Sequence, residues 1–294
     1  MLILDAGPAV GYLGAFCLVA SGWNLCLFFL RISEKPIAAI ECQSVSEDKF
    51  RSEITRFCHL IYEKGYVAST DGNVSARLPD GNIMCTPTIC NKGFVKPEDM
   101  VIIDMRGNRV KGERKASSEI AMHLLIYEMR PDVKAVVHAH PQCATAYAAA
   151  GIPLNKALIS EVVLALGCIP LTEYGTPGTP ELTEELRPFV KDFDALLMAN
   201  HGVVTYGANL EDAFNRMDTV EHFAKISIYT KILGRERLLS AEDVEKLRVQ
   251  RQKYYGLEGS DSHTMADIGK AMGLSRERVR QIECGALTRL RQAV

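Results

Sequence analysis

The spacing of apolar and polar residues predicts a globular region that begins near Glu47. Apolar side chains recur at helical intervals from Phe50 to Tyr62, and Gly65 suits the C-terminal cap of the helix that they indicate. Two further helices are predicted at residues 117–129 and 210–233. The region between these helices carries the signals of strands and turns.

Alternating or continuously apolar stretches predict strands between the helices. The turn chemistry of residues 79–82 indicates a hairpin that joins the first two strands. The predicted strands cover residues 74–78, 83–85, 101–104, 135–140 and 195–199. Hairpins mixed with helices favour an α/β layered domain over a strictly parallel sheet.

The N-terminal segment differs from the rest, because residues 6–30 contain no charged side chain. A run of this length could span a membrane, which takes about 20 apolar residues. Its glycines weaken that interpretation, and a buried helix, a secretory signal or an extension without a structural role are the alternatives. The pattern therefore divides the chain into an N-terminal extension (1–46), a globular domain (47–258) and a tail (259–294).

Composition places the chain among globular proteins with a substantial core. Of its 294 residues 47% are apolar, and the net charge of -2 gives no global reason to expect nucleic acid or an anionic membrane as a partner. The nine cysteines are scattered, odd in number and without a CxxC motif. We interpret them as reduced thiols, which predicts a cytoplasmic protein.

Three histidines form the clearest candidate metal site. His138 and His140 are two residues apart on a predicted strand, so their side chains are expected on the same face. His201 follows another apolar strand, and neutral imidazoles are good zinc ligands. The pair alone could be the polar end of a strand; the third histidine favours a metal site.

Hydroxyl and acidic side chains stand where the second predicted helix begins. Ser117 and Ser118 could bind an anion there together with free backbone N–H groups, or could simply cap the helix. Glu119 could favour the helix dipole or serve as a general acid/base beside the metal. The turns at residues 71–75 and 86–88 offer further donors for a phosphate, although they equally suit hairpins.

The segments GNVSARL, CTPT, ASSEIAMH, VVHAHP, EYGTPGT and MANHG, taken in this order, resemble the class II aldolase/adducin family. The likeness is greatest to L-fuculose-phosphate aldolase-like members and extends from about residue 48 to residue 258. It implies a three-layer fold with a mostly antiparallel central sheet flanked by helices. It also implies a homotetramer with active sites at subunit interfaces.

The resemblance assigns roles to individual residues. It implies that Glu119 is the catalytic acid/base and that Tyr255 reaches the active site of a neighbouring subunit. The implied Zn²⁺ ligands, which would also fit manganese, cobalt or iron, are His138, His140 and His201. The implied phosphate-binding residues are Asn73, Thr88, Ser117 and Ser118. The chain departs from the aldolases at residues 158–162, where it lacks their second tyrosine; Glu161 could replace it or be structural.

The activity implied is reversible cleavage of a ketose 1-phosphate, such as L-fuculose 1-phosphate, to dihydroxyacetone phosphate and an aldehyde. The alternatives on the same scaffold are a sugar-phosphate epimerase, a dehydratase and a 3-oxo-acid decarboxylase. Glu119 disfavours the epimerases, which resemble this pattern with aspartate at that position. An adducin-like binding module would lack the histidines. His123, one helical turn after Glu119, is interpreted as a packing or supporting residue.

The C-terminal tail carries a second resemblance. Residues 264–291 read as helix, glycine turn and helix, and they resemble the helix-turn-helix of bacterial sigma factor region four. In such a motif the second helix enters the major groove of DNA. The implied DNA-contacting residues are Arg276, Glu277, Arg280 and Gln281. The alternative is an amphipathic tail that packs on the enzyme, joined to it by a linker at residues 256–263.

Overall fold

The computed structural model describes the backbone of residues 37–254 and the side chains of residues 47–251. The fold below belongs to the unit that begins at Cys42, and its first helix starts five residues earlier, at Ile37. The predicted features of residues 6–30, the linker, the helix-turn-helix and Tyr255 lie outside the described residues. Within the described part of the chain, no helix is both long and apolar enough to span a membrane.

A single eight-stranded sheet forms the centre of the domain, in the order β4-β3-β2-β1-β5-β8-β7-β6. All neighbours pair antiparallel except β6 and β7, which pair parallel at one edge. The strands are β1 (Asn73–Arg77), β2 (Ile83–Cys85), β3 (Val101–Ile103), β4 (Arg109–Lys111), β5 (Ala135–Ala139), β6 (Leu171–Thr172), β7 (Ala195–Met198) and β8 (Gly202–Gly207). The expectation of a mostly antiparallel sheet is confirmed.

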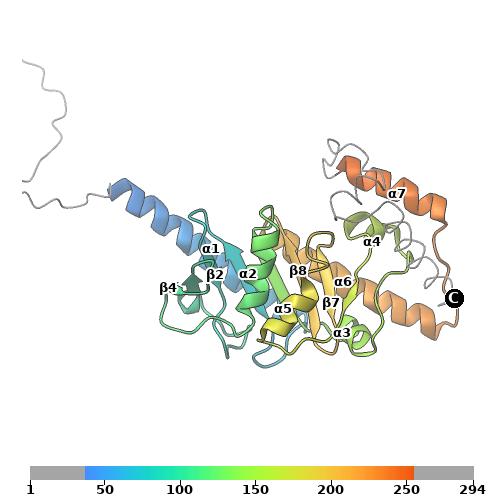
Figure 1. Ribbon diagram of the computed structural model, residues 1–294, viewed down its shortest axis with the longest axis horizontal. Coiled ribbons are helices and arrows are strands. Elements are labelled where there is room, and N and C mark those ends of the chain that lie inside the picture. The colour runs from blue at the N-terminus through green and yellow to red at the C-terminus, as the bar shows by residue number, and fades with distance from the viewer. Residues whose placement is uncertain (1–36, 255–294) are drawn as a thin grey trace, which may run out of the picture. The chain divides into compact units, whose positions relative to one another are not determined.

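Helices cover both faces of this sheet, which gives the predicted three layers (Figure 1). One apolar core joins the sheet to α1, α3 and α6, and the other joins it to α2 and α5. Strand β5 contributes to both, because Val137 enters the first core and Val136 the second. The helices are α1 (Ile37–Glu63), α2 (Ile120–Met129), α3 (Gln142–Ala149), α4 (Ser160–Ala165), α5 (Pro180–Leu186), α6 (Leu210–Ile232) and α7 (Ala241–Tyr254), with a short 3₁₀ helix at Pro97–Asp99.

The structure corrects the predicted start of α2. The sequence predicted a helix from Ser117, whereas α2 begins at Ile120 and Glu119 is its N-cap residue. Ser117 stays outside the helix because its backbone N–H bonds to the Thr86 carbonyl, 3.2 Å away, next to an isolated bridge between Pro87 and Ala116. Ser117 and Ser118 therefore lie on a loop that is held against the residues after β2.

Strand β8 was not predicted, and it completes the sheet between β5 and β7. Its register sets His138 opposite Val204, while β1 sets Asn73 opposite His138 on the other side. The turn from β7 to β8 therefore brings His201 to the end of the sheet where β5 finishes. The pairing of the central strands therefore brings together residues that the sequence placed at separate strand ends.

Candidate metal centre

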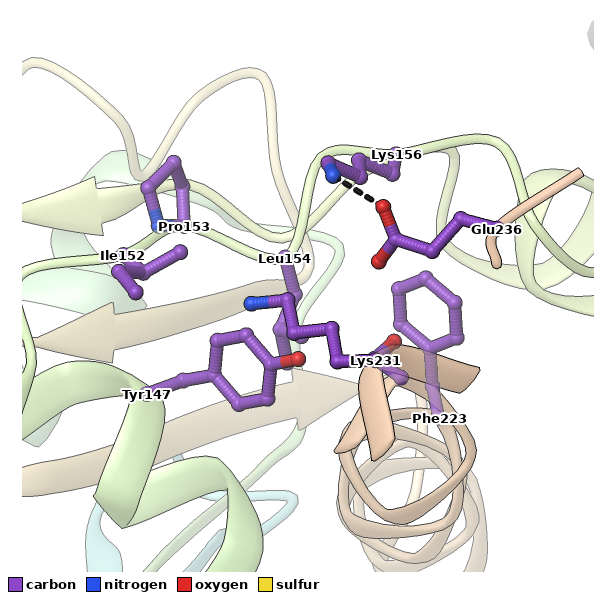
Figure 2. A pocket seen from close by; sticks show the side chains of 9 residues that line it. Tyr147, Ile152, Pro153, Leu154, Lys156, Phe223, Lys231 and Glu236 are labelled. Atoms are coloured by element: carbon purple, nitrogen blue, oxygen red, sulfur yellow. Dashed lines mark hydrogen bonds and ion pairs between the residues drawn. The ribbon is translucent and has the colours of Figure 1, made fainter. Parts of the chain in front are cut away.

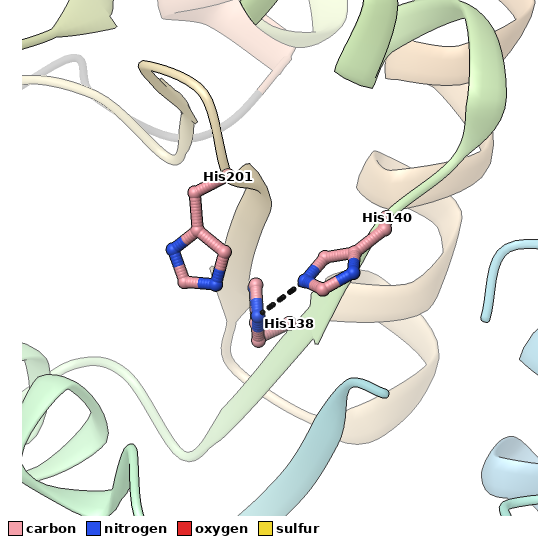
Figure 3. A group of neighbouring side chains, drawn as sticks. All are labelled: His138, His140 and His201. Atoms are coloured by element: carbon pink, nitrogen blue, oxygen red, sulfur yellow. Dashed lines mark hydrogen bonds between the residues drawn. The ribbon is translucent and has the colours of Figure 1, made fainter. Parts of the chain in front are cut away.

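The three predicted histidines converge at one end of the sheet (Figure 3). His138 is the fourth residue of β5, His140 follows the end of that strand, and His201 lies in the turn between β7 and β8. Their ring centroids are 4.8–5.2 Å apart, and one ring nitrogen from each lies within 4.8 Å of the other two. The predicted cluster is thus assembled by elements that are distant in sequence.

Backbone contacts hold these rings in place. His138 Nδ1 lies 2.9 Å from the Val203 carbonyl, and the His140 backbone N–H donates to the Tyr66 carbonyl at 2.8 Å. Asn200 adopts a φ of 54°, the left-handed conformation that turns the chain before His201. Gly202 is closely packed, because a Cβ there would lie 2.4 Å from His140 Cδ2. The local sequence thus leaves the rings little freedom.

The Glu119 carboxylate faces the histidine cluster from the N-terminus of α2. Its Oε2 lies 3.2 Å from His138 Nε2, and its Oε1 lies 3.0 Å from His201 Nε2. Asn73 Nδ2 donates a 2.8 Å hydrogen bond to Oε2. Burial raises the pKa of Glu119, but the adjacent His138 and His201 outweigh it and hold the pKa well below its usual range. Glu119 is therefore an ionised, acceptor-only group at this point.

The donor and acceptor inventory of this cluster fits a bound cation. If His138 donates its Nδ1–H to the Val203 carbonyl, its Nε2 presents a lone pair toward Glu119 Oε2 and toward His140 Nε2, which is 3.1 Å away. Glu119 Oε1 is buried and lacks a partner with hydrogen-bond geometry. The acceptor atoms of the histidines and of Glu119 therefore outnumber the N–H groups that could donate to them. Three imidazole nitrogens with a carboxylate suit Zn²⁺ or a similar divalent ion.

The residues expected to bind phosphate lie on neighbouring segments. The Thr88 backbone N–H donates to the Lys115 carbonyl at 3.0 Å, which joins its loop to the one that carries Ser117 and Ser118. Ser118 is exposed, Thr88 is partly exposed, and Ser117 is buried at 8% exposure. Asn73 is also buried, and its amide is occupied by Glu119 and His123. The structure thus brings Thr88 and the two serines together, and ties Asn73 to the carboxylate.

Other residues near the centre carry weak sequence signals. Asp71 Oδ2 lies 3.5 Å from His140 Nδ1. Lys92 is 1% exposed, and its ammonium donates to the carbonyls of Thr70 and Cys90, which joins the two loops around the site. A buried lysine has no signature in a single sequence. Glu161 is exposed and accepts a hydrogen bond from the neighbouring Ser160.

A separate small pocket lies between α3, α6 and the loop before α7 (Figure 2). Its lining includes Tyr147, Ser227 and Glu236, each with a buried oxygen that has no hydrogen-bond partner. The cavity volume is about 20 Å³, which is room for a single water. This pocket is too small for a sugar phosphate and contains no histidine, so the cluster at the sheet end is the better candidate active site.

Comparison with known proteins identifies the class to which this fold and site belong. Residues 52–228 match the model of the Class II Aldolase and Adducin N-terminal domain, so the chain belongs to this family. Residues 252–292 match the model of Sigma-70, region 4. Both resemblances seen in the sequence are confirmed, and divalent-metal dependence is typical of the enzymes in the first family.

The relatives include two kinds of enzyme. The 3-oxo-tetronate 4-phosphate decarboxylase of Escherichia coli O6:H1 is 35% identical over 208 residues, which cover 69% of this chain and 96% of that protein. The L-fuculose phosphate aldolase of Methanococcus maripaludis C7 is 37% identical over 176 residues, which cover 58% of this chain and 92% of that protein.

Solved structures include neighbours at similar identity. YgbL from Escherichia coli superposes with a TM-score of 0.64 at 34% identity, covering 69% of this chain and 99% of YgbL. An L-fuculose 1-phosphate aldolase superposes with a TM-score of 0.65 at 32% identity, covering 70% and 96% of the two chains. The fold is thus that of class II aldolase-type enzymes.

Proposed function

We propose that this chain is a divalent-metal-dependent lyase that cleaves a carbon–carbon bond in a phosphorylated substrate and releases dihydroxyacetone phosphate. The observation that carries the proposal is the convergence of three imidazoles and the Glu119 carboxylate on one point. The loops of Thr88 and of Ser117–Ser118, held together by backbone hydrogen bonds, supply donors for the phosphate.

Each group has a separate task in this reaction. His138, His140 and His201 would hold a Zn²⁺ ion, which would supply Lewis-acid stabilisation of the negative charge that develops on substrate oxygens. Glu119 transfers a proton at the carbon from which the leaving fragment departs, and Asn73 keeps its carboxylate in place. The phosphate loops fix the other end of the substrate and so orient the bond to be cleaved.

Aldol cleavage is the first candidate reaction. A ketose 1-phosphate, for example L-fuculose 1-phosphate, would give dihydroxyacetone phosphate and an aldehyde, and the proton of the hydroxyl next to the broken bond must be removed. In the aldolases that this chain resembles, a tyrosine belongs to the segment matching residues 158–162, and no tyrosine occurs there. Tyr255 from a neighbouring subunit is the remaining proposed acid/base on this side.

Decarboxylation is the second candidate reaction. A 3-oxo-tetronate 4-phosphate that loses its carboxyl carbon as CO₂ and gains a proton at the next carbon also becomes dihydroxyacetone phosphate. CO₂ departs without a hydroxyl deprotonation, so the missing tyrosine is no obstacle. The decarboxylase of Escherichia coli O6:H1 covers 69% of this chain, which supports this reaction as a candidate beside the aldol cleavage.

The test combines metal content with product formation. We would measure zinc by elemental analysis and dihydroxyacetone phosphate release from L-fuculose 1-phosphate and from 3-oxo-tetronate 4-phosphate, for wild type and His140→Ala. Stoichiometric zinc and release from either substrate, both lost in the variant, would support the lyase. Release with an aldehyde or with CO₂ separates the two reactions. A zinc-loaded wild type that is inactive on both would refute the proposal and redirect assays to dehydration.

The family resemblance also carries a proposed assembly. A homotetramer would place Tyr255 of one subunit at the active site of the next. Light scattering of the full chain measures the number of subunits. Mixing inactive His140→Ala with inactive Tyr255→Phe subunits tests whether each active site combines residues of two subunits. Partial recovery of activity in the mixture would support shared sites, whereas no recovery from co-assembled subunits would contradict them.

The C-terminal segment supports a second activity, DNA binding, because residues 252–292 match a family of DNA-recognition domains. Arg276, Glu277 and Gln281 would contact bases, and Arg280 would contact phosphates. A gel-shift assay of the full chain and of Arg276→Ala/Gln281→Ala tests this. Salt-sensitive binding that the double variant weakens would support it; wild-type protein that leaves DNA unshifted at low salt would exclude it.

A further inference from the structure

A line of buried polar side chains extends from Glu119 into the space between β1 and α2. Asn73 and Ser75 are two apart on β1 and so face the same side of the sheet. Glu119, His123 and Tyr127 are four apart at the start of and along α2, and so share one face of the helix. The two periodicities bring all five side chains into one polar row inside an apolar layer.

Hydrogen bonds connect every neighbour in this row. Asn73 Nδ2 donates to Glu119 Oε2 at 2.8 Å, and Asn73 Oδ1 is in short contact with His123 Nε2. His123 Nδ1 lies 2.6 Å from Ser75 Oγ, which in turn lies 2.8 Å from Tyr127 Oη. Asn73, Ser75, His123 and Tyr127 are each no more than 3% exposed. Water therefore cannot replace a lost partner without entering the core.

The orientation of the Asn73 amide fixes the direction of the other hydrogen bonds. Asn73 presents its NH₂ group to Glu119 Oε2 and therefore its Oδ1 to His123. His123 then donates from Nε2–H and accepts at Nδ1 from the Ser75 hydroxyl, which leaves Tyr127 to donate to Ser75. Burial lowers the pKa of His123 to about 3, so the ring carries a single N–H.

We infer that His123 is a positioning residue for Glu119, acting through Asn73, and that Ser75 and Tyr127 hold His123 in the required tautomer. This inference deepens the proposed lyase function and rests on it. The two ends of an asparagine amide have the same shape, so only hydrogen-bond partners decide which end faces Glu119. If the amide flips, Asn73 Oδ1 faces the carboxylate, two acceptors repel, and Glu119 leaves its place beside the histidines.

Two substitutions of equal charge separate this role from simple core packing. In His123→Gln the side-chain NH₂ reaches the position of His Nε2 and keeps the donor to Asn73. In His123→Asn the shorter amide reaches only the position of Nδ1, so it keeps the contact with Ser75 and loses Asn73. Both variants remove the ring from the same buried site, and thermal unfolding reports how far each is destabilised.

We expect the two variants to differ in kcat and to have similar values of KM. His123→Asn should lower kcat about 10–100-fold, the usual cost of losing a partner that orients a metal-site group. His123→Gln should stay within about threefold of wild type. KM should change little in either variant, because the Asn73 amide is occupied by Glu119 and His123, which leaves phosphate binding to Thr88, Ser117 and Ser118, and these make no bond to His123. Equal kcat losses in two folded variants, or no loss in either, would overturn the inference.

A readout independent of activity is the tautomer of His123. In protein labelled with ¹⁵N-histidine, long-range ¹H–¹⁵N spectra should show His123 protonated at Nε2, with its signals identified by their absence in His123→Gln. A ring protonated at Nδ1 would reverse the row of hydrogen bonds and refute the inference. If this tautomer is found but wild type has no lyase activity, the proposed function fails while the hydrogen-bond assignment stands.

Discussion

Replacing Gly202 with alanine tests whether the histidine geometry depends on close packing. Gly202 is the first residue of β8 and lies beside the ring of His140. A Cβ at this position would lie 2.4 Å from His140 Cδ2 and 2.8 Å from the Ala139 carbonyl oxygen. Both contacts are closer than real Cβ atoms make, and neither partner is the free end of a flexible side chain.

The size of the effect follows from these distances. Ordinary van der Waals contact begins near 3.4 Å, so the His140 ring must retreat by about 1 Å, whereas a metal ligand tolerates deviations of only ~0.2 Å. His140 would then bind poorly or not at all. We expect affinity for Zn²⁺ to fall at least about tenfold, or ~1.4 kcal/mol, together with a packing cost of about 1–3 kcal/mol in folding stability.

The assay is competition for Zn²⁺ with a chromophoric chelator, and Gly207→Ala is the matched control. Gly207 ends the same strand, and its added Cβ would lie 2.7 Å from Asp212 Cβ, away from the histidines. The control should lose stability in a similar way and keep wild-type zinc affinity. If Gly202→Ala binds zinc as tightly as the control does, the argument that Gly202 packing holds His140 in the metal site is wrong.

Three further substitutions test other parts of the site. His138→Ala should abolish stoichiometric zinc binding, measured by elemental analysis after dialysis, because it removes the most buried of the three imidazoles; retained zinc would contradict the ligand assignment. Glu119→Gln should keep bound zinc but lower kcat about 10²–10⁴-fold, the range for losing a general acid/base; a variant with wild-type kcat would remove Glu119 from the mechanism. Between pH 3 and 6.5 the unfolded chain protonates His123 and the folded chain does not, since burial lowers its folded pKa to about 3. As the pH falls through this window, the free energy of unfolding of metal-free wild type, measured by urea titration, should fall faster than that of His123→Gln, by up to about 1.4 kcal/mol per pH unit. Equal dependence of the unfolding free energy on pH in the two proteins would show that His123 does not contribute.

The sequence predicted much of the candidate site because its signals are local. His138 and His140 stand at the end of an apolar run, and His201 follows the next one, so each was expected at a strand end. Periodicity predicts where strands end, and three histidines at strand ends indicate a metal site. The helix at residues 210–233 was equally clear, because its amphipathic pattern persists over several turns.

Long-range pairing accounts for what the sequence did not predict. Strand β8 begins directly after a turn whose Asn200 is left-handed, so its apolar residues had no clear boundary. The placement of Ser117 outside α2 depends on a hydrogen bond to Thr86, far away in the chain. The hydrogen bond from His123 to Asn73 depends on the period of a helix, on the period of a strand, and on the packing of α2 against β1, which a single sequence does not show.

Because the three histidines come from separate segments, the folding stability of this domain depends on the supply of metal. An ion bound by His138, His140 and His201 cross-links β5 to the turn between β7 and β8, two segments that the unfolded chain does not hold together. Binding restricted to the folded state adds about 4 kcal/mol of stability when the free ion is a thousandfold above its dissociation constant. In a cell short of the metal, this protein would be degraded faster by proteases as well as being inactive.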